Sequence, residues 1–522
     1  MRIWESYRNY KNDTNPENFR FNLAEQGLLE SPSLPSEHFP TIIRKENDLP
    51  LRGQICLSTT VGRRKVRFIQ LATYVRQIFY AQPLRRFVHG FCLFDKEIEF
   101  WMIDRTGAYS SGYISIENDE QALVRAISSY LLMSDKELGL DITIRQVDGR
   151  SMIKIVEDES GETKEIEIDP KPLIKTRRLV SRGTTCYRSL DDKYLVKYSW
   201  HELCGESEAD LLKEALPLKG VVNLVASDII HSYTDHWEYL KSLGPSRWHL
   251  RPKKQLLNDS DTSDTFHDTE ENNAYILRRF VLSPYGRPLQ SCTSVLQFLI
   301  VLRDAILAHK SLFIEKDIIH NDISDSNIII VTPTEDDRSR GMLIDLDHSI
   351  ALYDRDLPYL MRRPVGTIKF MALESLYAAT APRYRDIDNF RRTYRQDLES
   401  FFYVFLTGCV EYGRDPDLPR MDLESWCNNK IDENIENKRI DVNENFKDLL
   451  NKKFSSSFVD AKELAKELKQ LVYRMSAKPI EYLHYHDFLY NETIKAFNKT
   501  IGKIEVGKIP NRTWSNKTTV GV

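Results

Sequence analysis

The feature that most constrains how this chain can fold is a short polar stretch between two apolar ones, I-I-H-N-D-I-S-D-S-N-I-I-I, from Ile318 to Ile330. An apolar pattern with helical spacing precedes it, and an Ile/Val string typical of a strand follows it. The polar residues in the middle are therefore predicted to form a loop. In this loop Asp322 stands five residues before Asn327.

This spacing suits phosphoryl transfer. An aspartate can orient a hydroxyl group and accept its proton, and the carbonyl oxygen of an asparagine side chain can ligate Mg²⁺. The sequence therefore predicts Asp322 and Asn327 as catalytic residues, with Asn327 also a metal ligand. The alternative is a polar turn between a helix and a strand, and this loop taken alone leaves that alternative open.

A second segment supplies a further acidic residue. G-M-L-I-D-L-D-H-S-I, residues 341–350, places Asp345 after a short apolar run, and the T-P-T-E-D-D-R-S-R-G before it is typical of a hairpin loop. A strand pair at this point would bring Asn327 and Asp345 together, where both could hold a metal ion between the phosphates of ATP. Asp345 is therefore predicted to bind metal and cofactor.

Two later segments complete a pattern. V-G-T-I-K-F-M-A-L-E ends at Glu374, and Asp397 opens the apolar stretch D-L-E-S-F-F-Y-V-F-L. In this order and spacing, the four segments resemble the large lobe of protein kinases. They match its catalytic loop, its metal-binding Asp-Phe-Gly, the Ala-Pro-Glu that ends the activation segment, and the Asp that heads the central helix. The resemblance implies ATP and Mg²⁺ as cofactors and a protein as substrate.

The preceding region resembles the small lobe of a kinase. L-V-S-R-G-T-T-C-Y-R-S, residues 179–189, is similar to a glycine-rich phosphate loop with Gly183 as its only glycine. Lys197 ends an apolar run, like the strand lysine that binds the α- and β-phosphates. The segment Y-I-L-R-R-F-V-L-S-P-Y-G-R-P-L, residues 275–289, is similar to the strand that enters the hinge. The resemblance implies that Val281 and Ser283 bind the adenine through backbone groups.

A glutamate that pairs with the strand lysine is expected on the next helix. In E-S-E-A-D-L-L-K-E-A the residue whose position fits best is Glu208, which precedes two leucines; Glu206 and Glu214 are its rivals. The resemblance therefore implies that Glu208 takes part in binding the cofactor.

The particular residues in these motifs resemble one family, the fungal-type protein kinases. R-G-T, K-Y-S-W, H-N-D-I-S, I-D-L-D, G-T-I-K-F-M-A-L-E and D-L-E-S-F-F-Y-V carry the resemblance. Q-L-A-T-Y-V-R-Q-I-F-Y-A-Q-P-L-R-R-F-V-H-G and F-W-M-I-D-R-T-G extend it to about residues 50–410. The resemblance implies an α+β, bilobal protein-kinase-like fold, with a β-rich small lobe and a helical large lobe after a separate α+β N-terminal domain. It also implies transfer of the ATP γ-phosphate to Ser/Thr hydroxyls of proteins.

Four positions depart from the general kinase pattern. Asn321 stands in place of Arg, Ser324 in place of Lys, Asp347 in place of Gly and Leu373 in place of Pro. Ser324 removes a cation that stabilises the transferred phosphate. Asp347 would either stiffen its turn or add a carboxylate near the metal. Asn321, Ser324 and the single glycine of the phosphate loop support the alternative of a pseudokinase that serves as a scaffold. A small-molecule phosphotransferase of the aminoglycoside-kinase kind shares the His-x-Asp and Asp-x-Asp patterns, but lacks an activation segment such as residues 348–374.

The composition shifts along the chain predict its domains. We expect a flexible tail at 1–35, an N-terminal α+β domain at 36–160, a small lobe at 161–285 with a flexible insertion near 254–273, a large lobe at 286–505 and a tail at 506–522. Apolar periodicity predicts helices at 64–80, 120–132, 396–412, 459–475 and 481–500, strands at 87–94 and 98–103, and a hairpin at 152–168. The N-terminal domain is interpreted as regulatory or docking, without catalysis of its own.

Composition narrows the partners and the compartment. Lys and Arg number 73 against 77 Asp and Glu, so the net charge of −4 gives no bulk electrostatic reason to expect nucleic acid or a membrane surface. No apolar run of about 18 residues predicts a spanning helix. Seven scattered cysteines without a C-x-x-C pair favour neither disulfides nor zinc. We therefore expect an intracellular, cytoplasmic or nuclear protein with a protein substrate; the sequence does not determine the oligomeric state.

Overall fold

The computed structural model describes residues 64–94, 96–105, 107–202, 207–232, 247–249, 275–352, 365–380, 393–414, 421–428, 430–476 and 486–515. The expected tail at 1–35, the expected insertion near 254–273 and residues 516–522 lie outside these ranges. The chain divides into two compact units, Met1–Gly205 with Val225–Leu282, and Glu206–Leu224 with Ser283–Val522. Both contain helices and strands, which confirms the predicted α+β class. Within the described ranges, no helix has the length and apolar character needed to cross a membrane.

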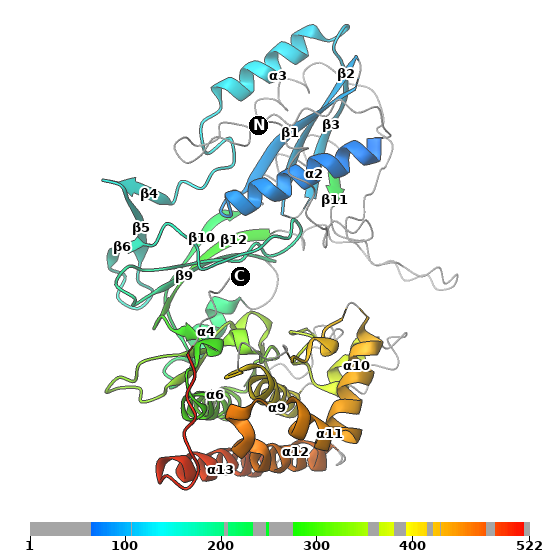
Figure 1. The fold of residues 1–522 in the computed structure, drawn as a ribbon. Helices are drawn as coiled ribbons and strands as arrows, with labels where there is room; N and C mark the ends of the chain where they lie inside the picture. Colours follow the sequence, from blue (N-terminus) through cyan, green and yellow to red (C-terminus); the bar gives the residue numbers. More distant parts are fainter. Residues whose placement is uncertain are drawn as a thin grey trace, which may run out of the picture. The chain divides into compact units, whose positions relative to one another are not determined.

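The first unit begins with a helix on an antiparallel sheet (Figure 1). Its elements are α2 (Arg64–Ala81), β1 (Phe87–Phe94), β2 (Glu97–Asp104), β3 (Gly107–Ser115), α3 (Glu120–Leu132) and β11 (Arg247–His249), and the sheet order is β1-β2-β3-β11. α2 packs on β1 through a core that includes Phe68, Val75 and Trp101. Both predicted helices and both predicted strands are confirmed. β3 was not predicted, because G-A-Y-S-S-G-Y-I-S lacks the apolar alternation of a typical strand.

Two further sheets complete the first unit. β4 (Ile144–Val147), β5 (Arg150–Val156) and β6 (Thr163–Ile168) form an antiparallel sheet, which confirms the predicted hairpin. The second sheet has five strands in the order β10 (Asn223–Ser232), β12 (Tyr275–Ser283), β9 (Leu195–Glu202), β8 (Thr185–Arg188) and β7 (Ile174–Lys175). Val196, Tyr198 and Val281 are fully buried at its centre.

The second unit is mainly helical. Among its described residues the α-helices are α4 (Glu208–Ala215), α6 (Val295–Lys316), α7 (Leu373–Thr380), α9 (Tyr394–Glu411), α10 (Ile431–Arg439), α11 (Phe446–Asp448), α12 (Lys462–Ser476) and α13 (His486–Glu505). α9, α12 and α13 confirm the helices predicted at 396–412, 459–475 and 481–500. α6 packs against both α9 and α13 (Figure 1). Its apolar side chains are buried on several faces. The Ser294 hydroxyl caps its first turn by accepting a hydrogen bond from the N–H of Gln297 at 3.1 Å.

Short strands connect these helices and pack along α6. β13 (Arg287–Pro288), β15 (Ile328–Ile330) and β16 (Gly341–Leu343) form one small sheet, and β14 (Ile318–Ile319) pairs with β17 (Ile350–Ala351). All three residues of β15 are buried. The loops between these strands carry Asp322, Asn327 and Asp345, three of the residues predicted to be functional.

Candidate active site

The pairing of β15 with β16 positions the predicted metal ligands of the second unit. Ile328 lies opposite Leu343, and the N–H of Ile344 donates to the carbonyl of Asn327 at 3.1 Å. The hairpin predicted from the sequence is therefore confirmed. Asn327 directly precedes β15, and Asp345 follows β16 after one residue, in a left-handed conformation with φ of 68°. The strand pair thus brings their backbones together at one end of the small sheet.

The pairing of β14 with β17 holds the same loop from its other side. Ile319 lies opposite Ile350, and the side-chain amide of Asn321 donates to the carbonyl of His348 at 3.1 Å. The Ser349 hydroxyl donates to the carbonyl of His320 at 3.2 Å. Asn321, which stands where many kinases have Arg, therefore connects the loop around Asp322 directly to the turn after Asp345.

A buried carboxylate on α9 fixes the backbone of this loop. Oδ2 of Asp397 accepts hydrogen bonds from the N–H groups of His320 and Asn321, both at 3.0 Å, and from Nε2 of His309 at 2.8 Å. Burial opposes ionisation of Asp397, but the hydrogen bond from His309 and the nearby histidines outweigh it and lower its pKa below the ordinary value. The ionised carboxylate can thus stabilise Asn321 at its φ of 64°, which a non-glycine residue rarely adopts.

His320 is a structural part of the loop rather than a proton carrier. Burial lowers its pKa, so the ring is neutral. Nδ1 accepts the N–H of Asp322 at 3.3 Å, which leaves Nε2 as the donor to the carbonyl of Ile344 at 3.0 Å. The neutral ring therefore connects the backbone of Asp322 to the residue before Asp345.

The carboxylate of Asp322 is oriented by three side-chain hydrogen bonds. Oδ1 accepts from the backbone N–H of Thr367 at 2.7 Å and from its hydroxyl at 2.8 Å. Oδ2 accepts from the amide of Asn327 at 3.2 Å. An ionised carboxylate has about four acceptor positions, so one acceptor direction on Oδ2 remains for a substrate hydroxyl.

The amide of Asn327 is turned so that its oxygen can ligate a cation. Nδ2 donates to the carbonyl and to Oδ2 of Asp322, at 2.9 and 3.2 Å. Both donors of the amide group are thereby used, and Oδ1 accepts no hydrogen bond from the described part of the chain. A carbonyl oxygen and a carboxylate, which Asn327 and Asp345 would supply, form a donor set that fits Mg²⁺.

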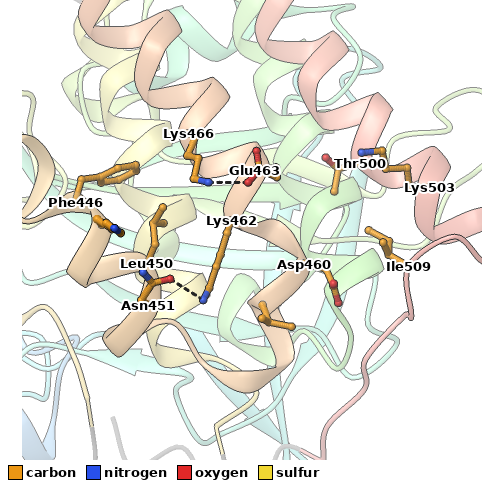
Figure 2. A pocket seen from close by; sticks show the side chains of 12 residues that line it. Phe446, Leu450, Asn451, Asp460, Lys462, Glu463, Lys466, Thr500, Lys503 and Ile509 are labelled. Atoms are coloured by element: carbon orange, nitrogen blue, oxygen red, sulfur yellow. Dashed lines mark hydrogen bonds and ion pairs between the residues drawn. The ribbon is translucent and has the colours of Figure 1, made fainter.

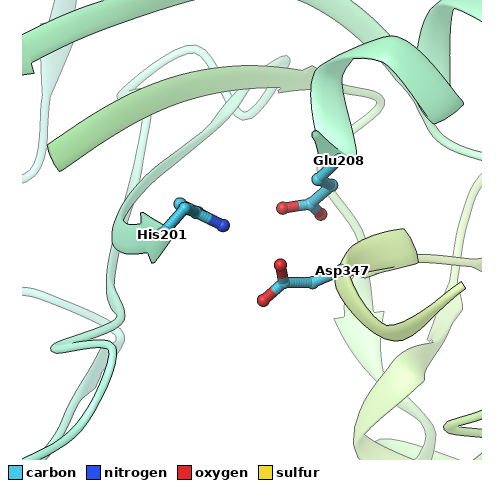
Figure 3. Close-up of side chains that lie close together, drawn as sticks. All are labelled: His201, Glu208 and Asp347. Carbon is cyan, nitrogen blue, oxygen red and sulfur yellow. The ribbon is translucent and has the colours of Figure 1, made fainter. Parts of the chain in front are cut away.

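Helix α4 contributes a second carboxylate near the turn that follows Asp345. Glu208 is its first residue and is buried, with 2% of its surface exposed, whereas the rival Glu214 is exposed and Glu206 lies outside the described residues. α4 packs against the turn Leu346–His348, and carboxylate oxygens of Glu208 and Asp347 lie within 4.8 Å of each other (Figure 3). Asp347 therefore faces α4.

Other predicted cofactor residues lie in the first unit. Lys197 is on β9 with 5% of its surface exposed, and its Nζ lies 5.7 Å from the centre of the Phe280 ring. Val281 pairs with Val196 in the same sheet. Gly183 has φ of +62°, and a Cβ there would meet Nε of Arg105 at 3.0 Å. Ser283, at the end of β12, belongs to the second unit.

The start of the segment that resembles a phosphate loop packs into the core of the N-terminal sheet. Leu179 is buried in the same cluster as Phe68 and Trp101. The guanidinium of Arg105, at the end of β2, donates to the carbonyl of Arg178 at 2.6 Å and lies 4.5 Å from the centre of the Phe79 ring. The N-terminal sheet and this loop therefore form one packed structure within the first unit.

Sequence reasoning missed a buried network that supports the segment around Thr367. Lys438 on α10 is fully buried, and its Nζ donates to the carbonyls of Met371 at 2.8 Å and Ile368 at 3.3 Å. Burial lowers the pKa of Lys438 to about 7. The N–H of Leu373 donates to Glu399 at 2.8 Å, a bond that proline could not make at this position. The departure from Ala-Pro-Glu thus has a structural role.

Thr367 was also missed as a functional residue. It lies within the quoted G-T-I-K-F-M-A-L-E segment, and the signal was the glycine before it. Gly366 has φ of +133°, and a Cβ there would lie 2.9 Å from the carbonyl oxygen of Asn321. Only a glycine allows this close approach, which places Thr367 against Asp322. Ser324 is fully buried with its hydroxyl 2.8 Å from that of Ser326.

A family model described as fungal protein kinase matches residues 45–409, which include both units' predicted site residues and the segment ending at Glu374. No curated protein matches the chain.

Proposed function

The chain belongs to the fungal protein kinase family, and we propose that it transfers the γ-phosphate of ATP to serine or threonine hydroxyls of protein substrates. The observation that carries this proposal is the carboxylate of Asp322, which three hydrogen bonds orient while one acceptor direction stays available. A carboxylate held in this way can align a hydroxyl for attack and accept its proton.

The metal-binding part of the proposal rests on the Asn327–Asp345 pair. Asn327 through Oδ1 and Asp345 through its carboxylate would hold Mg²⁺, which when bound neutralises charge on the ATP phosphates. The chain's own contribution is positional: the β15–β16 pair fixes both residues at one end of a sheet. Asp347 adds a further carboxylate beside Glu208, and we assign it no catalytic role.

The remaining ATP contacts are proposed from the family pattern. Lys197 would act on the α- and β-phosphates with Glu208 as its partner, Gly183 would lie near the phosphates, and Val281 and Ser283 would receive the adenine. The buried position of Lys197 supports this role, because lysine is rarely buried unless its charge is paired. We also propose the bilobal arrangement and the domain boundaries given above as expectations.

A protein substrate is favoured over a small molecule by the contact between Thr367 and Asp322. The segment that carries Thr367 corresponds to the end of a kinase activation segment, and its backbone is held by Lys438 and Glu399. Small-molecule phosphotransferases of the aminoglycoside-kinase kind lack such a segment. In this chain a buried lysine and a buried glutamate hold the segment in place.

The test is transfer from γ-labelled ATP to generic protein substrates. We expect transfer by the wild type and at least about a hundredfold loss in Asp322→Asn and in Asp345→Ala. The matched control is Asp336→Ala, an exposed aspartate in the loop between β15 and β16, which keeps wild-type activity. Phosphoamino-acid analysis of the product distinguishes Ser/Thr from Tyr. Equal labelling by wild type and both site variants would refute catalysis and favour the scaffold alternative.

A further inference from the structure

A pocket of about 610 Å³ lies in the second unit between α11, α12 and the end of α13 (Figure 2). None of the residues predicted for phosphoryl transfer lines it. Its apolar part is formed by Phe446 and Leu450, which are buried, together with Ile509 and with Val459, which is 40% exposed. The pocket therefore offers an apolar surface that is accessible from solvent.

Lysines surround this apolar part. Four of them line the pocket, Lys447, Lys462, Lys466 and Lys503, against two acidic residues, Asp460 and Glu463. Both acidic side chains are already paired, Asp460 with Arg512 at 3.0 Å and Glu463 with Lys466 at 2.7 Å.

Three of the lysines keep an uncompensated charge. Lys462 donates to the neutral amide of Asn451 at 3.2 Å (Figure 2), and Lys447 and Lys503 form no ion pair within the described ranges. The hydrogen bond from Lys466 and the charges of Lys466, Lys503 and Lys499 lower the pKa of Glu463. This shift has the direction that a positive potential at the wall of the pocket produces.

We propose that this pocket docks an acidic segment of a protein partner, one that places an apolar side chain between carboxylates. The excess of lysine charge favours an acidic ligand, although the whole chain carries a net charge of −4. The apolar base favours a ligand with an apolar side chain, because a nucleic acid or a lipid headgroup would gain little from covering Leu450 and Val459. The volume lies in the range of pockets that bind small ligands and short peptide anchors.

Charge dependence is tested by fluorescence anisotropy with the full chain and a fluorescein-labelled peptide, Glu-Asp-Leu-Phe-Asp-Glu. We expect saturable binding that Lys462→Glu/Lys503→Glu weakens at least tenfold. Lys452→Glu/Lys495→Glu introduces the same charge change at lysines outside the pocket, 70% and 71% exposed, and should change binding less than twofold. Circular dichroism and Tm show that each variant is folded. If both double variants weakened binding equally, binding would depend only on the overall charge of the chain, and the proposal would be overturned.

Apolar dependence is tested in the same assay. Replacing Leu and Phe of the peptide by Ser, or Val459 of the chain by Trp to fill the pocket, should each weaken binding at least tenfold. Undiminished binding in either case overturns the proposal, as does failure of the wild type to bind. Equally tight binding of phosphatidylserine vesicles or single-stranded RNA would assign the surface to a different class of partner. Asp322→Asn should bind the peptide as the wild type does, so the result is independent of phosphoryl transfer.

Discussion

Asp322 and Thr367, 45 positions apart in the chain, are joined by two hydrogen bonds that end on the same oxygen, Oδ1 of Asp322. One comes from the backbone N–H of Thr367 and the other from its hydroxyl, at 2.7 and 2.8 Å. The segment that we propose to correspond to the end of a kinase activation segment is thereby connected to the proposed catalytic carboxylate. The orientation of Asp322 then depends on how firmly this segment is held.

The first prediction removes the hydroxyl bond alone. Thr367→Val keeps the shape of the side chain and the backbone bond to Oδ1, but loses the hydrogen bond from the hydroxyl to the carboxylate of Asp322. We expect kcat to fall about tenfold or more, with little change in Tm because Thr367 is exposed. Thr367→Ser, which keeps the hydroxyl, should retain activity within about threefold. An unchanged kcat in the valine variant would show that the backbone bond to Oδ1 and the bond to Oδ2 are enough to orient the carboxylate.

The second prediction concerns the pH dependence of stability that Lys438 causes. Burial lowers its pKa to about 7 in the folded protein, whereas an unfolded lysine titrates near its ordinary value of about 10.4. Between these two values the unfolded state binds more protons than the folded state, so the contribution of Lys438 makes the protein more stable as the pH rises. The difference in free energy of unfolding between wild type and Lys438→Met should therefore grow in favour of the wild type from pH 7 to 9.

Denaturant unfolding at pH 7, 8 and 9 measures this difference directly. The methionine variant also leaves the carbonyls of Ile368 and Met371 without their donor, but that loss does not vary with pH. Lys452→Met, a lysine that is 70% exposed, is the matched control and should follow the wild-type profile. If the difference in free energy of unfolding between wild type and Lys438→Met stayed constant from pH 7 to 9, it would contradict a lowered pKa of Lys438.

The loops that carry Asp322, Asn327 and Asp345 could be predicted from the sequence, because local patterns determine where these loops lie. Asp322, Asn327 and Asp345 flank two short apolar runs with a hairpin loop between them, so pairing of the runs was enough to bring their loops together. Asp397 was predicted by its place at the start of a very apolar helix. Its role in holding the backbone of His320 and Asn321 could not be read from that position, because it depends on a tertiary contact.

The contacts of Lys438 and Glu399 with the segment around Thr367 could not be predicted either, because they also depend on tertiary packing. I-D-E-N-I-E-N-K-R, the sequence of α10, has the polarity of a solvated surface helix, yet Lys438 within it is fully buried. A buried lysine is rare, and no local pattern marks one. The site's centre is thus encoded in local sequence, whereas the contacts that hold Met371 and Leu373 arise only when α9 and α10 pack on the segment.

The third prediction tests the ionised state of Asp397. Its pKa is lowered in the folded protein despite burial, chiefly through His309, so its contribution to stability is present above the ordinary carboxylate value of about 4 and is lost as the pH falls. Asp397→Asn cannot ionise, so the wild type's advantage in free energy of unfolding should be largest near pH 6 and shrink below pH 4. Asp325→Asn, half-buried at the start of the 3-10 turn Asp325–Asn327, serves as control. An advantage that persists undiminished below pH 3 would argue that the carboxyl group is protonated throughout.

The last prediction separates the backbone strain caused by a glycine replacement from its effect on the KM for ATP. Gly183 and Gly161 both have positive φ, +62° and +70°, so alanine strains the backbone at either position by about 1 kcal/mol. They differ in their surroundings: a Cβ at Gly161 meets nothing within 4 Å, but one at Gly183 meets Arg105 and Trp200 at 3.0 and 3.1 Å. Because Arg105 also holds the carbonyl of Arg178, Gly183→Ala should displace the proposed phosphate loop. We expect its KM for ATP to rise at least fivefold, while Gly161→Ala loses similar stability and keeps the wild-type KM. Equal KM values in the two variants would place the loop outside the nucleotide site.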